Sequence, residues 1–434
     1  MINFKQISVQ KKANALGFLA VGLSAVAQFV LAPVIKFYIG AEGLGMWHLL
    51  FQTFTYLQIV DLGLSNGIIR ELAAAKVRGA KYFSDTVATA MRAFTWVGMA
   101  FAGLGGITCF LLPCFIDLPL TLRKSFLIAL ILFSCWGFFR YRYAIHFISL
   151  YATNRIDIFN ALNLLLGPGR PLMGMVFLTL KLGLPGVAIG YILVEAIVRA
   201  IALKIQKLPL ASGCYDHKQF IKMFVFGGTT SVVSLSTLLI FFSSSFIIGW
   251  RVGVIKIAIY QSSIALLFLI HRFAITPFSN LLPEFIRYCE TGDIFYMLKK
   301  KGLYCHSIVM LATFISLVIA AFINKLFVTL WLGEEFFAGY HFTVVYSFFI
   351  LLSVARHNGY IMYQAIDYLK PMLICHLIQI PINLCLSLIL LDKFGLIGIA
   401  YAYLLSSLPL IIISQLVFIR IPEKHFRNMI KSQA

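Results

Sequence analysis

The sequence predicts an all-α membrane protein whose chain crosses the bilayer repeatedly. Of the 434 residues, 61% are hydrophobic and 12% are charged, whereas soluble domains are about half apolar and a quarter charged. Apolar runs long enough to span a bilayer, about 20 residues each, recur along almost the whole chain. The runs lack the alternation of membrane-spanning strands, and lipid otherwise accepts only helices.

Charged and turn residues divide the chain into twelve predicted spans. These spans lie near residues 14–38, 44–66, 88–112, 125–148, 158–180, 184–204, 223–247, 254–276, 303–325, 341–363, 371–391 and 395–419. The first begins directly after Lys11 and Lys12 and is too long for the core of a signal peptide. We therefore expect it to be retained as the first helix.

The basic residues predict which ends of these helices face the cytoplasm. With the N-terminus placed inside, most of the 36 lysines and arginines fall on cytoplasmic loops, tails and helix ends. This is the positive-inside asymmetry, and it predicts that both termini are cytoplasmic. The net charge of +20 therefore requires no nucleic-acid partner. Residues 299–301 and the basic tail after residue 419 are expected to contact anionic membrane lipids.

An internal repeat predicts two halves of similar structure. KLGLPGVAIGYIL (181–193) and KFGLIGIAYAYLL (393–405) match at seven of thirteen positions, although a short outer turn between two helices also accounts for this match. Six spans return the chain to its starting side, so the halves run in parallel, as in many transporters. We predict an N-terminal six-helix bundle at 1–204, a cytoplasmic linker at 205–222 and a C-terminal bundle with a short basic tail at 223–434.

Three motifs carry a family resemblance across this layout. DLGLSNGIIRELA (61–73) closes the second span, LGLPGVAIGY (182–191) opens the sixth and LWLGEEF (330–336) follows the ninth. Together they resemble the Wzx-type flippases for lipid-linked oligosaccharides, within the multidrug/oligosaccharidyl-lipid/polysaccharide (MOP) exporter superfamily. The resemblance implies a V-shaped pair of bundles around a cationic cavity.

The resemblance also implies an activity and a location. The protein would move undecaprenyl-diphosphate-linked repeat units across a bacterial inner membrane by alternating access, for O-antigen or capsule synthesis. A polysaccharide polymerase and glycosyltransferases are its implied partners. No catalytic residue, cofactor or metal site is predicted, since the eight cysteines form no CxxC or Cys/His ligand pattern.

Other functions remain as alternatives. A cation-coupled multidrug exporter of the same superfamily would favour an acidic cavity, yet arginine outnumbers acid within the spans. A lipid II flippase usually has additional helices. A glycolipid polymerase or ligase is expected to carry a long outer loop, whereas the longest outer loops here are short.

The strongest candidate for a substrate site is LLLGPGRPLMG (164–174), where glycines and prolines surround Arg170. Proline removes a backbone donor and clashes with the preceding turn, so we expect the helix to kink or unwind here and near Pro381 in the eleventh span. Paired interruptions mark transporter binding sites. Arg170 suits a phosphate or carboxylate because its fork is bidentate. Alternatively, Arg170 pairs with a carbonyl or buried acid in a kinked packing helix.

Five further basic residues are candidates for substrate contact. Arg140 and Arg142 lie in the inner-leaflet third of the fourth span, two residues apart, so only one is expected to face a cavity. These arginines, and Arg92 near the cytoplasmic start of the third span, can instead snorkel to lipid headgroups. Arg356 lies in the tenth span. Lys36, at the outer end of the first span, is either an interface anchor or part of an outer vestibule.

The remaining candidates concern gating or proton coupling. They are Asp61, Glu195, Arg199, His271, Arg272, His357 and His376. Glu195 and Arg199 have the spacing of an intrahelical ion pair, so self-neutralisation competes with coupling. Histidine changes charge near neutral pH, but helix-end histidines are also simply hydrated. Asp61 lies at the cytoplasmic end of the second span. The equivalent end of the eighth span carries His271 and Arg272, whose charge is opposite to that of Asp61. This predicts a cytoplasmic gate, with a plain helix end as the alternative.

Overall fold

A computed structural model provides the three-dimensional structure of the chain. It describes residues 4–153, 155–208, 213–290, 300–366 and 368–419. These ranges contain helices and no strand, so the predicted all-α class is confirmed. The predicted lipid contacts at residue 299 and after residue 419, and linker residues 209–212, lie outside the described ranges.

The chain packs as two compact units. Unit 1 comprises Met1–Leu235 and Val252–Ala258, and unit 2 comprises Ser236–Arg251 and Ile259–Ala434. The long helix α8 (His217–Arg251) therefore contributes its first part to unit 1 and its last part to unit 2. The division predicted at 1–204, 205–222 and 223–434 stays a prediction.

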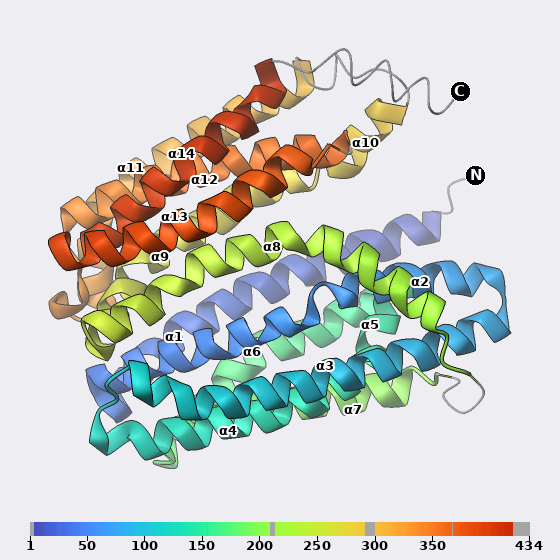
Figure 1. Ribbon diagram of the computed structural model, residues 1–434, viewed down its shortest axis with the longest axis horizontal. Helices are drawn as coiled ribbons and strands as arrows, with labels where there is room; N and C mark the ends of the chain where they lie inside the picture. The colour runs from blue at the N-terminus through green and yellow to red at the C-terminus, as the bar shows by residue number, and fades with distance from the viewer. Residues whose placement is uncertain (1–3, 154, 209–212, 291–299, 367, 420–434) are drawn as a thin grey trace. The chain divides into compact units, whose positions relative to one another are not determined.

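Unit 1 is built around helix α6, which packs against α1 and α7, while α3 packs against α4 (Figure 1). Besides the start of α8, its elements are α1 (Phe4–Leu57), η1 (Gln58–Asp61), α2 (Leu64–Arg78), α3 (Ala80–Phe115), α4 (Leu120–Arg142), α5 (Ala144–Ala152), α6 (Ile156–Thr179) and α7 (Gly183–Ile205).

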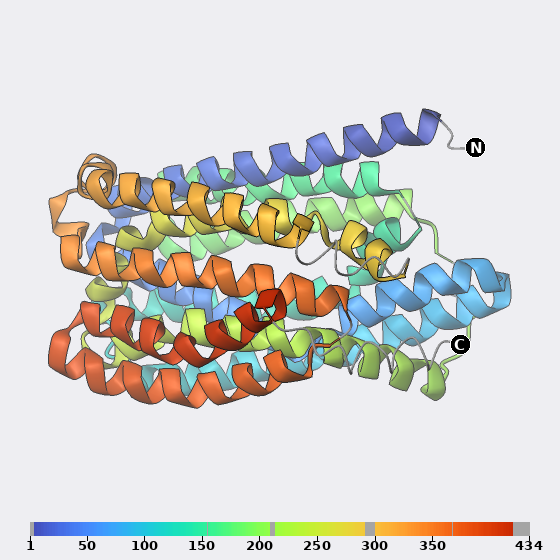
Figure 2. The same cartoon turned by 90° about the horizontal axis from the view of Figure 1, so that it is seen from above.

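Unit 2 is centred on helices α12 and α14, which pack against each other, with α13 on α14 and α11 on α12. Besides the end of α8, its elements are α9 (Val254–Ser279) from Ile259 onward, α10 (Leu282–Glu290), α11 (Leu303–Trp331), η3 (Glu334–Phe336), α12 (Tyr340–Ala365), α13 (Lys370–Phe394) and α14 (Leu396–Ile419). Within this unit α11 to α14 run along a common direction (Figure 2).

The helices account for the predicted spans. Helix α1 supplies the first two, joined at Gly40 in a left-handed conformation (φ 83°), and α3, α4, α6, α7, α8, α9, α11, α12, α13 and α14 supply one each. Within the described residues, nine helices are long and apolar enough to cross a membrane, including Leu19–Asp61. Helix α8 is not among them, and neither is α12. Helix α12 buries most of its side chains, Arg356 and Asn358 included, so these face protein.

The helices do not unwind at the predicted interruptions, and a kink at these prolines stays a prediction. Helix α6 continues through Pro168 and Pro171, and α13 continues through Pro381. Glycines here allow close helix packing instead of unwinding. A Cβ atom on Gly167 would collide with Ser24 Oγ of α1, and one on Gly190 of α7 would lie 2.6 Å from the α6 backbone. Packing against α1 and α7 thus keeps α6 helical despite its two missing donors.

Candidate functional site

The centre of unit 1 is a buried carboxylate, Glu195 on α7, which is 4% exposed. Arg170 on α6 donates from Nη2 to Glu195 Oε1. Trp136 on α4 donates from Nε1 to Oε2 at 2.8 Å. Helices α4, α6 and α7 therefore meet at one acid, whose two oxygens both accept hydrogen bonds.

Two more arginines approach the same carboxylate. Arg140 Nε lies 3.9 Å and Arg199 Nη2 lies 4.0 Å from Glu195 Oε2. Arg140 also donates to Gln58 Oε1 at 3.3 Å and lies 5.2 Å from the centre of the Phe54 ring. We call Arg140, Arg170, Arg199 and Glu195 the Glu195 cluster. Because arginine stays protonated in proteins, the cluster has an excess of positive charge.

A small cavity adjoins the Glu195 cluster. Its volume is about 30 Å³, and its lining includes Phe54, Trp136, Tyr191, Arg170 and Glu195. This is room for a water but not for a substrate. Among the described residues, the Nε atoms of Arg170 and Arg199 have no hydrogen-bond partner. The cluster therefore retains donors for an anion.

Unit 2 contains a second buried cation, Arg356 on α12, which is 9% exposed. Its Nη2 donates to Ser353 Oγ at 3.3 Å, and His271 Nε2 of α9 lies 3.1 Å from that same hydroxyl. His357 Nε2 lies 2.8 Å from Ser279 Oγ.

Arg356 has histidines around it instead of an acid. It interacts electrostatically with His271, His357 and His376, and these four residues form the Arg356 cluster. Within the described residues, no carboxylate lies at ion-pair distance from Arg356. Within that part of the chain, no acid therefore neutralises its charge.

Helix α13 extends this polar interior. His376, Gln379, Asn383 and Ser387 lie on one face of α13 and are at most 3% exposed. Each keeps an atom without a hydrogen-bond partner among the described residues. The polar residues that flank Pro381 in the sequence therefore face inward, although the helix does not break there.

Several predicted site residues stay outside both clusters. Arg142 is half-buried on α4 and interacts electrostatically with His146. Of the two arginines, Arg140 is the one that lies near Glu195. Exposed Arg92 lies 5.2 Å from the centre of the Tyr215 ring. Lys36 is half-buried on α1, and Arg272 is exposed on α9. Their predicted roles stay predictions.

Asp61 has a local structural role. Its Oδ1 accepts a hydrogen bond from the Ser65 backbone N–H at 3.2 Å, at the point where η1 ends and α2 begins. Gly63 adopts a left-handed conformation (φ 75°), which an L side chain rarely adopts. The stretch is therefore a turn between two helices. Asp61 also interacts electrostatically with Arg140, which relates it to the Glu195 cluster.

The same stretch packs against the start of α8. A Cβ on Gly67 would collide with the Met223 carbonyl, and one on Gly227 would collide with the carbonyl of Gly63. Lys222 Nζ then pairs with buried Glu71 at 2.9 Å. The glycines of DLGLSNG thus provide a close helix contact within unit 1.

Sequence reasoning missed the neutral residues that hold the charged ones. These are Trp136, Gln58, Ser353 and Ser279. Trp136 had a usable signal, because it precedes Arg140 by four residues and so shares its helix face. Ser353 likewise lies three residues before Arg356. Gln58 and Ser279 reach their partners from other helices, which no local spacing indicates.

Comparison with known proteins supports the fold. The chain matches no protein-family model and no curated protein sequence. Among solved structures, it is similar to an inward-facing multidrug resistance MATE family transporter of the MOP superfamily, with a TM-score of 0.80 and 13% identity over 96% of this chain and 100% of that one. It is also similar to the lipid II flippase MurJ in an inward closed conformation, with a TM-score of 0.72 and 16% identity over 95% of this chain and 89% of that one.

A third structure differs in its described polarity. It is a MOP superfamily transporter from Pyrococcus furiosus, for which a reverse polarity of the binding pocket suggests a different function. Its TM-score is 0.61 at 14% identity, covering 95% of this chain and 96% of that one. At these identities the likeness concerns the fold, and it agrees with the predicted twelve helices in two repeats. The chain is therefore a multi-pass membrane protein with the fold of the MOP superfamily transporters.

Proposed function

We propose that the protein is a Wzx-type flippase that moves an oligosaccharide linked to undecaprenyl diphosphate from the cytoplasmic to the outer leaflet of a bacterial inner membrane. The observation that carries this proposal is that the buried arginines outnumber the carboxylates that could neutralise them among the described residues. Three arginines share Glu195, and no carboxylate of the described residues lies at ion-pair distance from Arg356.

The physical argument concerns what such a charge requires. A buried arginine cannot lose its proton, and an unpaired ion inside a membrane protein is costly and marks function. An anionic ligand that pairs with it offsets this cost. A diphosphate suits the task because guanidinium groups bind its oxygens through parallel hydrogen bonds. An exporter of organic cations would need carboxylates in these places.

The proposed mechanism is alternating access with both termini in the cytoplasm. The head group pairs with the buried arginines while the lipid tail stays in the bilayer. Because the cavity beside Arg170 is only about 30 Å³, the head group meets Arg170 in a different conformation from the one described. A role of Asp61, His271 and Arg272 in closing the cytoplasmic side belongs to this proposal.

Transport by the reconstituted protein tests the proposal. Proteoliposomes containing an undecaprenyl-diphosphate-linked oligosaccharide are assayed for its arrival in the opposite leaflet. Arg356→Ala should reduce transport strongly. Arg251→Ala is the matched control in unit 2, because Arg251 is exposed and pairs with Asp392 at 3.6 Å. Full transport by Arg356→Ala would contradict the proposed role of buried charge.

Multidrug export is the second candidate function, favoured by the structural likeness to a MATE transporter. It predicts that the same proteoliposomes accumulate an organic cation such as ethidium when a sodium or proton gradient is applied. That accumulation would be independent of Arg356. The two functions are thus separated by the charge of the molecule transported.

A further inference from the structure

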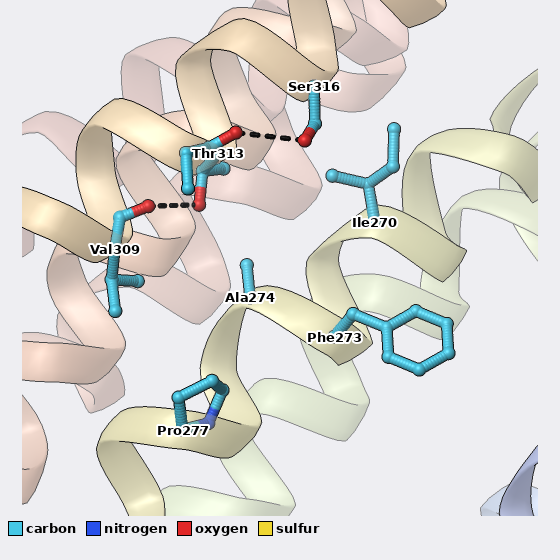
Figure 3. Close-up of a pocket in the computed structure, with 8 residues that line it drawn as sticks. Ile270, Phe273, Ala274, Pro277, Val309, Thr313 and Ser316 are labelled. Carbon is cyan, nitrogen blue, oxygen red and sulfur yellow. Dashed lines mark hydrogen bonds between the residues drawn. The ribbon is translucent and has the colours of Figure 1, made fainter.

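Unit 2 has an apolar groove between α9 and α11 that the proposed function does not use (Figure 3). Its volume is about 320 Å³, which is within the size range of small-molecule sites. Its lining includes Ile270, Ala274 and Pro277 of α9 and Val309, Ala312 and Ser316 of α11.

Helical spacing produces the groove. The three α9 residues are four and three positions apart, so they lie on one helix face. Val309, Thr313 and Ser316 have the same spacing on α11 and also share a face. Figure 3 shows side chains of the two helices on opposite sides of the space. Alanines at 274 and 312 leave the middle of it open because they have no side chain beyond Cβ.

The two hydroxyl groups in the groove already donate hydrogen bonds within their own helix. Thr313 Oγ1 donates to the Val309 carbonyl at 2.6 Å, and Ser316 Oγ donates to the Ala312 carbonyl at 2.8 Å (Figure 3). Both hydroxyls are therefore satisfied within α11. The remaining lining is hydrocarbon, so the groove suits an apolar chain.

Helix α9 also carries polar side chains outside the groove. His271 directly follows Ile270 in the chain, yet its ring meets Ser353, the hydroxyl that Arg356 also contacts. Arg272 comes next and is exposed. One helix thus presents an apolar groove on one face and the Arg356 cluster on another. Such a helix is complementary to an amphiphile with an anionic head and a long tail.

We propose that the α9–α11 groove binds the isoprenoid tail of the substrate while its phosphate head pairs with the Arg356 cluster. This proposal rests on the proposed function and deepens it by naming a site for the lipid. A long flexible tail can follow the surface of α9 from one face to the other.

Binding measurements on the purified full-length protein test this site. Three probes are used: undecaprenyl phosphate, geranyl phosphate and phosphatidylglycerol. Geranyl phosphate has the same phosphate head as undecaprenyl phosphate but a much shorter tail. Ala274→Leu and Ala312→Leu each fill the groove. Ala321→Leu is the matched control, because it makes the same change on α11 outside the groove.

We expect each groove variant to weaken undecaprenyl phosphate binding by about tenfold, since it removes apolar contact with the tail. Geranyl phosphate should bind as before, and Ala321→Leu should match the wild type. A folding defect in one variant would weaken the binding of undecaprenyl phosphate and of geranyl phosphate together. In that case the variant on the other helix provides the test of the tail site.

Two results would overturn the tail site. One is unchanged affinity for undecaprenyl phosphate in both variants. The other is an equal loss for phosphatidylglycerol, which would show that the groove takes bilayer acyl chains. Failure of the proposed function gives a different result, in which Arg356→Ala leaves geranyl phosphate binding intact.

Discussion

Both units bury arginine, but they treat its charge differently. In unit 1, Glu195 receives Arg170 and lies within 4.0 Å of Arg199 and 3.9 Å of Arg140. In unit 2, Arg356 has a serine hydroxyl and three histidines. The shared carboxylate of Glu195 fixes the guanidinium groups around it and joins three helices. The guanidinium of Arg356 is held by the Ser353 hydroxyl, but no carboxylate of the described residues neutralises it. We therefore expect the Glu195 cluster to stabilise its unit as well as to bind the proposed substrate, and the Arg356 cluster to contribute to binding only.

Removing the shared acid should have the largest effect. Glu195→Gln leaves Arg140, Arg170 and Arg199 without a counter-charge, and breaking a buried pair in this way costs about 3–5 kcal/mol. We expect low membrane abundance and a markedly lower Tm for the purified protein.

Glu334→Gln provides the control for that change. Glu334 is 69% exposed and pairs with Lys325 at 2.7 Å, and exposed ion pairs contribute little. Its Tm should equal that of the wild type. A stable, abundant Glu195→Gln protein would remove the distinction between the two clusters.

Removing the unneutralised cation should instead affect binding alone. Arg356→Ala should weaken binding of inorganic diphosphate by about a hundredfold, because the lost partner is a buried charge. Stability should stay the same or rise, since an uncompensated buried ion disappears. Calorimetric titration and thermal unfolding measure the two quantities. Lower stability with unchanged binding would assign Arg356 a structural role.

A smaller loss of stability is expected at Trp136. Trp136→Phe removes the indole donor to Glu195 Oε2, and hydrogen bonds to charged groups contribute about 1.5–3 kcal/mol. Thermal unfolding should show this loss while transport by the remaining folded protein persists. Trp96→Phe is a suitable control, because Trp96 is 42% exposed. Equal Tm values for both variants would show that the carboxylate does not depend on the indole.

The smallest effect is expected for Arg170→Lys. Lysine keeps the charge beside Glu195 but lacks the bidentate fork, so diphosphate binding should weaken by about tenfold with abundance retained. Arg170→Ala, which also removes the charge, is the larger change at this position and should abolish surface glycan, while Arg140 and Arg199 still neutralise Glu195 and maintain abundance. If Arg170→Ala loses abundance instead, Arg170 belongs to the structural part of its cluster.

Much of the fold follows from the sequence because lipid leaves few choices. Long apolar runs predicted the helices, whereas the join between the first two spans at Gly40 appeared only in the structure. The glycines and prolines around Arg170 do not unwind α6 as expected, and the packing role of Gly167 depends on Ser24 of another helix. A local pattern does not reveal which helix approaches.

The sequence predicted the charged residues of the two clusters singly but did not predict how they are arranged. Spacing paired Glu195 with Arg199, four residues on, and the structure retains that pair at 4.0 Å. The closer partner, Arg170, comes from α6 and depends on how α6 packs on α7. Likewise His271 and His376 join Arg356 only through the fold of unit 2.

Charge selectivity tests the central claim most directly. Ligands that bind only the folded state raise the Tm, so the purified protein is unfolded by heat with inorganic diphosphate or with tetraphenylphosphonium. We expect diphosphate to stabilise the wild type and the organic cation to have no effect, with Arg356→Glu losing the response to diphosphate. Stabilisation of the wild type by the organic cation alone, unchanged in Arg356→Glu, would contradict an anion-binding function.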